Sequence, residues 1–184
     1  MLEIIILSIV IGMPVIMVVL FLKLFLQKDK KEKNVLIIKR CILIFYGISL
    51  FIVLFGIRMG TGYTSQQSLM EYIKYNSNII PFKTIMYYIN CLATDRLSKS
   101  LIIDNLMGNL IMFVPMGCLL PLIFKKQKKF GWFLLTQSII LISIEVGQLG
   151  FRLGSFDIDD LILNLVGAIV GFLLYLFFQK KQKK

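Results

Sequence analysis

Residues 157–184 read DIDDLILNLVGAIVGFLLYLFFQKKQKK, and this stretch decides the class of fold. Aspartates open it and lysines close it, while residues 161–178 between them carry no charge. At about 1.5 Å per residue, a helix over those residues covers most of the hydrocarbon core of a bilayer. The stretch therefore predicts a transmembrane helix with one acidic end and one basic end.

The rest of the chain has the same character. Of its 184 residues, 58% are hydrophobic, and the mean hydropathy is +0.82. A soluble domain of this length cannot hide so much apolar side chain from water. Further apolar runs predict spans at 4–22, 41–57, 105–124 and 130–149, the last interrupted by Glu145. We therefore predict an all-α, multi-pass transmembrane bundle of about five spans, forming a single membrane domain over residues 1–184.

The basic residues orient these spans. Residues 27–40, 125–131 and the tail after Phe178 together hold fourteen Lys or Arg, against six in the alternate segments 58–100 and 150–160. Because cytoplasmic loops are enriched in Lys and Arg, the N-terminus is expected outside and the C-terminus inside a bacterial plasma membrane. The lysine clusters are interpreted as anchors to the lipid bilayer rather than as nucleic-acid sites.

The long segment 60–100 is too polar to span the membrane and too apolar to lie entirely in water. Within it, residues 78–89 combine isoleucines, Met86 and the pair Tyr87 and Tyr88. This pattern predicts an amphipathic or re-entrant piece in the outer interface, with the tyrosines at headgroup level.

The chain has no histidine. This excludes Ser-His-Asp and Cys-His nucleophile systems and imidazole metal ligands. The cysteines Cys41, Cys91 and Cys118 are widely spaced, and only Cys91 falls outside the cytoplasm in the predicted topology, so no disulfide is expected. We predict no cofactor and no metal centre, although carboxylate and amide oxygens leave a divalent cation open.

Polar side chains within the spans are costly unless they pair or face a wet cavity. In the predicted topology those of the third, fourth and fifth spans all lie in the outer third of the membrane or just outside it. They predict a polar pocket that opens outward between these spans. Its candidate residues are Asn105, Asn109, Glu145, Gln148, Arg152, Asp157, Asp160 and Asn164.

Simpler interpretations apply to several of these residues. The asparagines can act as hydrogen-bonding links between helices, and Glu145 can form a structural pair with Arg152. Asp159 is interpreted as a solvated loop charge. The glycines Gly108, Gly167 and Gly171 are expected to permit close helix packing.

Several motifs follow one another in order over residues 78–175. They are Asn78-Ile79-Ile80-Pro81-Phe82, Asn105-x-x-Gly108-Asn109 with Phe113-x-Pro115-x-Gly117, Glu145-x-x-Gln148, Arg152, and Asp157-x-x-Asp160-x-x-x-Asn164-x-x-Gly167-x-x-x-Gly171. Any one fragment is weak, but the ordered set resembles the VanZ-like family of small bacterial membrane proteins. The resemblance implies a plasma-membrane protein linked to lowered susceptibility to teicoplanin-type glycopeptides. It also implies that the polar motif residues form a site that the family shares, without assigning a reaction to them.

Three mechanisms are open at this stage. In the preferred one, the pocket binds an envelope component at the extracytoplasmic face, such as a lipid-linked precursor or an anionic headgroup. The alternative is a membrane-embedded hydrolase or transferase of an envelope lipid, with Glu145, Asp157 and Asp160 as candidate acid and base. A transporter is disfavoured, because the sequence shows no inverted repeat and the inner halves of the spans are almost purely apolar. The ligand and the oligomeric state stay open.

Overall fold

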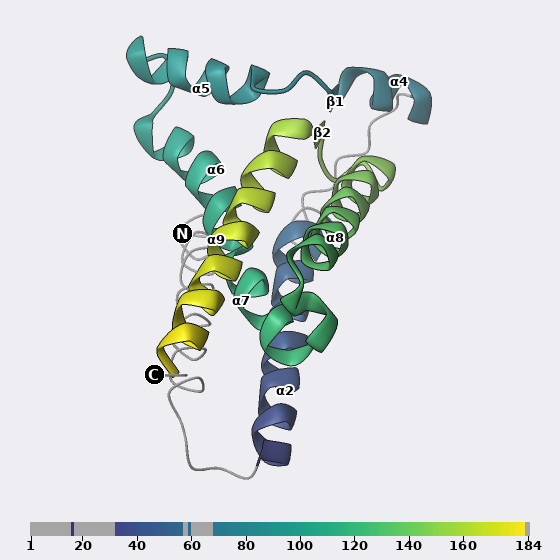
Figure 1. Ribbon diagram of the computed structural model, residues 1–184. Coiled ribbons are helices and arrows are strands. Elements are labelled where there is room, and N and C mark those ends of the chain that lie inside the picture. Colours follow the sequence, from purple (N-terminus) through teal and green to yellow (C-terminus); the bar gives the residue numbers. More distant parts are fainter. Residues whose placement is uncertain (1–15, 17–31, 57–58, 60–67, 183–184) are drawn as a thin grey trace.

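The protein is described by a computed structural model that covers residues 16, 32–56, 59 and 68–182 (Figure 1). α2 (Glu32–Phe51) continues into the π-helical turn η1 (Ile52–Gly56). α4 (Leu69–Tyr75), the two-residue strand β1 (Ser77–Asn78) and α5 (Lys83–Ala93) follow. The remaining elements are α6 (Lys99–Met112), α7 (Val114–Ile123), the short helical turn η2 (Lys125–Lys128), α8 (Phe130–Gly150), β2 (Phe156–Asp157) and α9 (Ile158–Gln182).

Four helical stretches in this part of the chain are long and apolar enough to cross a membrane. They are Val35–Gly56, Lys99–Ile123, Phe130–Gly150 and Ile158–Lys181. The predicted all-α, multi-pass architecture is thereby confirmed, and each stretch overlaps a predicted span. The remaining predicted span, 4–22, lies outside the described residues.

Two helices begin earlier than the charge pattern predicts. α6 starts at Lys99 rather than at residue 105, and α9 starts at Ile158 rather than at residue 161. The predicted spans end at the nearest charge, and the first turns of these helices carry polar side chains beyond the apolar stretch. The third predicted span is also broken at Phe113, where α6 ends and α7 begins. Pro115 lacks the N–H that a continuous helix would need there.

α9 is the central helix of the bundle. It packs against α6, α7 and α8, and α2 packs against α7. At Gly167 the backbones approach so closely that a Cβ would overlap the carbonyl oxygen of Leu110, and a Cβ at Gly171 would overlap that of Val114. Small residues at such crossings bring helices into direct backbone contact, which drives helix association in lipid.

The core between these helices is aromatic. The rings of Phe133 on α8 and Phe172 on α9 lie 4.6 Å apart, centre to centre. Tyr46 of α2 is buried beside them, and its hydroxyl donates a hydrogen bond to the carbonyl of Met112 at the break between α6 and α7. This contact ties α2 to the bundle and satisfies a polar group at the helix break.

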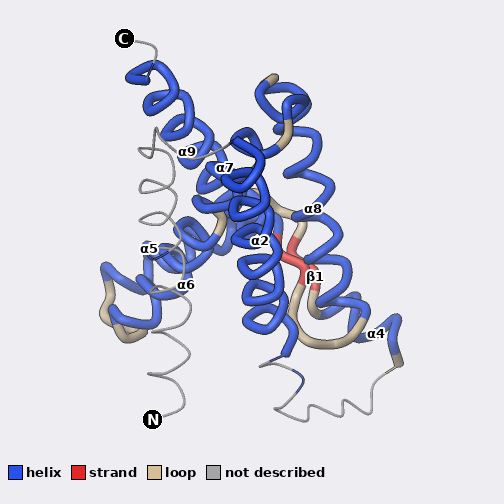
Figure 2. The backbone as a smooth tube through the Cα atoms, turned by 90° about the horizontal axis from the view of Figure 1, so that it is seen from below, coloured by secondary structure: helices blue, strands red, loops and turns tan. Residues whose placement is uncertain are grey.

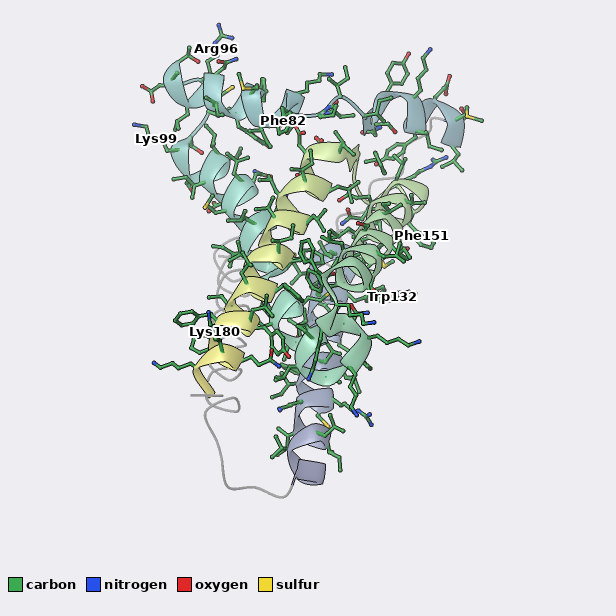
Figure 3. All side chains as sticks on the ribbon, in the orientation of Figure 1. Phe82, Arg96, Lys99, Trp132, Phe151 and Lys180 are labelled. Atoms are coloured by element: carbon green, nitrogen blue, oxygen red, sulfur yellow. The ribbon has the colours of Figure 1, made fainter. Side chains whose placement is uncertain are left out.

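The two ends of the bundle differ in chemistry. We call one the lysine end, because Lys125, Lys126, Lys128, Lys129, Lys180 and Lys181 lie on η2, the turn after it and the last part of α9. We call the other the polar end, which is formed by the end of α8, the starts of α6 and α9, and the two strands. Figure 3 shows Lys180 far from Arg96 and Phe82, which lie at the polar end.

α5 lies across the polar end, crosswise to the spans (Figure 1). The predicted interfacial segment is thus helical from Lys83 onward, with Met86, Tyr87 and Ile89 exposed. α4 was not predicted, although Ser68 and Glu71 form a capping box at its start.

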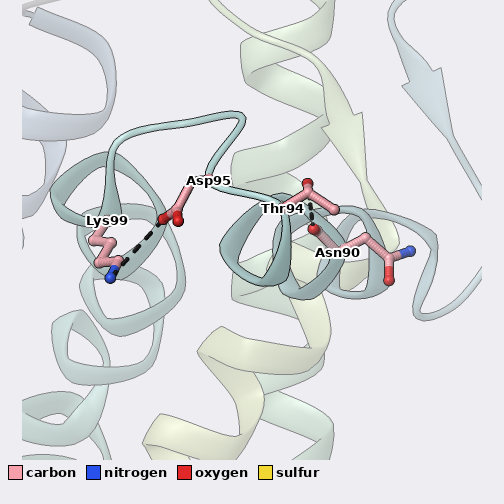
Figure 4. Close-up of polar contacts among 4 residues, drawn as sticks. All are labelled: Asn90, Thr94, Asp95 and Lys99. Atoms are coloured by element: carbon pink, nitrogen blue, oxygen red, sulfur yellow. Dashed lines mark hydrogen bonds and ion pairs between the residues drawn. The ribbon is translucent and has the colours of Figure 1, made fainter.

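The turn between α5 and α6 is closed by local contacts (Figure 4). The Thr94 hydroxyl donates to the Asn90 carbonyl at 2.8 Å, and the Lys99 ammonium lies 3.9 Å from the Asp95 carboxylate. Both members of this ion pair are largely exposed, so it contributes little stability.

Candidate functional site

A very short parallel sheet organises the polar end. Ser77 pairs with Phe156, and Asn78 pairs with Asp157 (Figure 2). The Phe156 N–H donates to the carbonyl of Asn76 at 2.8 Å. The segment before α5 is therefore fixed against the loop that joins α8 to α9.

Asp157 is the central acceptor of this junction. Its carboxylate accepts hydrogen bonds from the Asn78 amide at 3.1 Å, the Thr84 hydroxyl at 2.6 Å and the Asp159 N–H at 2.9 Å. Both oxygens are engaged, and the side chain is buried. Asp157 therefore holds β1 and the first turn of α5 onto the start of α9.

The structure corrects the interpretation of Asp159 made from the sequence. It was predicted to be a solvated loop charge, yet its side chain is 0% exposed. Its carboxylate accepts the backbone N–H groups of Phe82, Thr84 and Ile85, at the start of α5. Helix N-termini leave such N–H groups without partners inside the helix. A carboxylate there also interacts favourably with the positive end of the helix dipole. Asp159 therefore acts as a cap supplied from a distant part of the chain.

Glu145 and Gln148 lie on the buried face of α8. Glu145 is 4% exposed, and its Oε2 accepts the Asp157 N–H at 3.3 Å. The Gln148 amide donates to the Leu54 carbonyl at 3.1 Å, within η1. The two side chains thus connect α8 to β2 on one side and to the end of α2 on the other.

The two asparagines of α6 have different surroundings. The Asn109 amide donates to the Asp160 carboxylate, which joins α6 to α9. Asn105 is exposed, and its amide donates to the Leu101 carbonyl within α6 at 2.8 Å. The structure therefore brings Asn109 to the polar cluster and leaves Asn105 outside it.

Two further amides are buried on α8 and α9, beyond the polar cluster. Asn164 is 5% exposed, and its Oδ1 has no hydrogen-bond partner in the described part of the chain. Gln137 is 0% exposed, and within the same residues neither of its side-chain polar atoms has a partner. Gln137 was missed from the sequence, where the inner halves of the spans were taken as apolar. Its spacing from Glu145 and Gln148 on one helical face was the available signal.

Arg152 adopts an unusual backbone conformation directly after α8. Its φ of 57° lies in the left-handed region. Its N–H donates to Leu149 at 3.1 Å, and the Leu153 N–H donates to Gln148 at 2.8 Å, which completes a Schellman motif. That position usually holds glycine, and other residues are strained there. The Arg152 guanidinium lies 6.0 Å from the centre of the Tyr72 ring, half-buried at the edge of the polar end.

The strain predicts a difference between two substitutions. Arg152→Gly and Arg152→Ala both remove the guanidinium, but only glycine relaxes the left-handed backbone. We expect the Arg152→Gly variant to be more stable than Arg152→Ala by about 1 kcal/mol. Thermal unfolding of the two purified variants in the same detergent measures this difference. Equal unfolding temperatures would show that the backbone at residue 152 is not strained.

Tyr88 of α5 is a second residue that sequence reasoning did not assign to the site. Burial raises the pKa of Tyr88, and the carboxylates of Asp160 and Asp157 raise this pKa further. Its phenol therefore stays neutral at physiological pH and keeps an O–H donor near two carboxylates. The sequence placed this tyrosine only at headgroup level, because the contact between α5 and α9 joins distant residues.

The polar end thus combines two kinds of group. Asp157 and Asp159 hold α5 and β1 in place. The second group lies on the spans themselves and consists of Glu145, Asp160 and the amides of Asn109, Gln148 and Asn164. Across the described residues, no three or more His, Cys, Asp or Glu side chains are grouped so as to hold a metal ion. The groups present can bind hydroxyl and amide functions, and Arg152 adds a cation for an acidic group.

Comparison with known proteins gives consistent results. A family model described as VanZ/LLP1 matches residues 42–179, a range that starts further toward the N-terminus than the motif region at 78–175. Among curated proteins, "Protein VanZ" of Enterococcus faecium is 35% identical over 74 residues, which is 39% of this chain and 44% of that protein. The match therefore spans less than half the length of that relative. No solved structure matches the chain.

Proposed function

Because the chain belongs to the VanZ/LLP1 family, we propose that it binds a cell-envelope component at the extracytoplasmic face and thereby lowers susceptibility to teicoplanin-type glycopeptides. The membrane is the bacterial plasma membrane in this proposal. The observation that carries it is the gathering of buried polar side chains from α8 and α9, joined by the half-buried Asn109 of α6, at the end of the bundle opposite the lysines.

The charge distribution supports the outward placement of the polar end. η2 and the last turn of α9 bring their lysines to the same end of the bundle. Cytoplasmic ends of membrane proteins are enriched in Lys and Arg, and anionic lipids of that leaflet attract them. The proposal accordingly has the C-terminus in the cytoplasm and the N-terminus outside.

The chemistry of the polar end supports a ligand with both acidic and neutral polar groups. The Arg152 guanidinium suits a phosphate or carboxylate, and it lies beside the Tyr72 ring of α4 at the edge of the polar end. The amides and carboxylates nearer the spans suit hydroxyl and amide groups. A lipid-linked wall precursor carries both kinds of group, and its acyl chain would stay in the bilayer.

The orientation is tested by cysteine labelling in intact cells. Cys41 is exposed and is first replaced by serine, while Cys91 and Cys118 are buried. We expect a membrane-impermeant maleimide to label a Ser155→Cys variant at the polar end without permeabilisation. A Lys128→Cys variant at the lysine end should react only after permeabilisation. The reverse result would place the polar end in the cytoplasm and overturn the proposal.

Glu145 favours a second candidate function. A buried carboxylate within a membrane span is a candidate general acid or base. Together with Asp160 it would serve a hydrolase or transferase acting on an envelope lipid. Asp157 is a weaker candidate for this role, because both of its oxygens already accept hydrogen bonds that hold the fold together.

The Glu145→Gln variant separates the two functions. If the site only binds, losing one hydrogen bond should reduce protection against teicoplanin about fivefold or less. If Glu145 is catalytic, protection should disappear, and the envelope lipids should match those of cells without the protein. Ser143→Ala, on the exposed side of the same helix, is the matched control. A wild-type chain that gives a susceptible strain no protection would contradict both functions.

A further inference from the structure

Gln137 is the most completely buried polar side chain that the proposed function does not use. It lies on the same face of α8 as Phe133 and Leu141, which belong to the main core cluster with Ala168 and Phe172 of α9. Both polar atoms of its amide are buried and have no partner in the described part of the chain. Burying an amide without hydrogen bonds is costly in protein interiors and more so in a bilayer.

The packing of α8 on α9 sets the spacing, along the bundle axis, between this amide and that of Asn164. The Phe133 and Phe172 rings are in contact, which fixes the register of the two antiparallel helices. One turn along α8 leads from Phe133 to Gln137, and one turn back along α9 leads from Phe172 to Ala168. Asn164 follows one further turn on, about 5–6 Å away along the axis. Two amides with unpartnered atoms therefore lie about one helical turn apart along the bundle axis.

The unpartnered atoms define the chemistry of what would satisfy them. They are two carbonyl-type oxygens, from Gln137 and Asn164, and the amide nitrogen of Gln137. The oxygens need donors and the nitrogen needs an acceptor, so a simple cation or anion would satisfy only one kind of atom. Water supplies both functions and commonly bridges buried polar groups that direct contacts leave unsatisfied.

We infer that ordered water binds between Gln137 and Asn164, in the interior of the bundle below the polar end. The site extends the polar face of α8, formed by Gln137, Glu145 and Gln148, toward the middle of the membrane. It is a property of the chain itself and does not depend on which envelope component the polar end binds.

The site is tested by water-edited solid-state NMR of the protein in lipid nanodiscs without any envelope precursor. The probe is the side-chain amide of Gln137, assigned by comparison with a Gln137→Leu sample. We expect this amide to receive magnetisation from water, and we expect the transfer to be lost in the Asn164→Leu variant. An amide that receives none, or that receives it only after a lipid-linked precursor is added, would overturn the inference.

Thermal unfolding provides an independent measurement. If water bridges the two amides, Gln137→Leu and Asn164→Leu should each lower the unfolding temperature, and the double variant should lower it no further than the more harmful single change. Ser143→Leu, at an exposed position of α8, is the control and should leave the temperature unchanged. A higher unfolding temperature for Gln137→Leu would show that the amide is dry and merely unsatisfied.

Discussion

Asp159→Ala is expected to release α5 from the bundle and to make Cys91 reactive. The Asp159 carboxylate accepts three backbone N–H groups at the start of α5. Cys91 lies on α5 and is 4% exposed. At about 1 kcal/mol for each lost hydrogen bond, the change costs about 3 kcal/mol, which raises the population of the open state about 100-fold. The rate of Cys91 modification by a thiol reagent, in a Cys41→Ser background, measures this opening.

Two further variants make the result specific. Asp159→Asn keeps one acceptor oxygen and should fall between the wild type and Asp159→Ala. Asp95→Asn changes an exposed carboxylate just after α5, so its labelling rate should equal that of the wild type. Cys118, which is buried within the spans, reports whether the whole protein has unfolded. A Cys91 that stays unreactive in Asp159→Ala would contradict the capping role.

Gly167→Leu is expected to separate α6 from α9 and to abolish the folded bundle. Any side chain at residue 167 overlaps the carbonyl oxygen of Leu110, and backbone of a packed helix cannot move aside as a side chain can. We expect a destabilisation of about 3 kcal/mol or more. The Asn109–Asp160 hydrogen bond, which joins the same two helices, should be lost as well. Size-exclusion chromatography and thermal unfolding in detergent measure the effect.

Gly131→Leu is the matched control for this substitution. Gly131 lies in the first turn of α8, and nothing among the described residues lies within 4 Å of a Cβ placed there. The same leucine should therefore leave the unfolding temperature unchanged at residue 131. Equal stability of the two leucine variants would mean that the helices do not touch at Gly167.

The membrane architecture could be predicted from the sequence because lipid imposes a simple rule. Each span must be apolar over most of its length, so apolar runs such as 130–149, which Glu145 interrupts, coincide with helices such as α8. Helix starts could not be placed in the same way. The first two turns of α6 carry Lys99 and Asp104, and the first turn of α9 carries Asp159 and Asp160. A helix may continue in this way past the apolar region at no cost.

The polar cluster was only partly predictable. Both Asn105 and Asn109 were candidates for the pocket, yet it is Asn109 that contacts α9 through Asp160. Figure 1 shows α6 leaning away from α9 toward the polar end. Asn105 precedes Asn109 by one turn of α6 and is exposed. The cap formed by Asp159 joins residues more than seventy positions apart, and no local pattern marks its partners Phe82, Thr84 and Ile85.

Direct binding to the purified protein in nanodiscs tests the central claim that the polar end recognises an envelope component. The account predicts that a purified lipid-linked wall precursor binds the wild type. It predicts binding that is at least about tenfold weaker for Arg152→Gln, which removes a charge-assisted hydrogen bond but keeps the strained backbone. Lys128→Gln, at the lysine end, should bind like the wild type. Failure of the wild type to bind, or equal binding by all three proteins, would contradict the account.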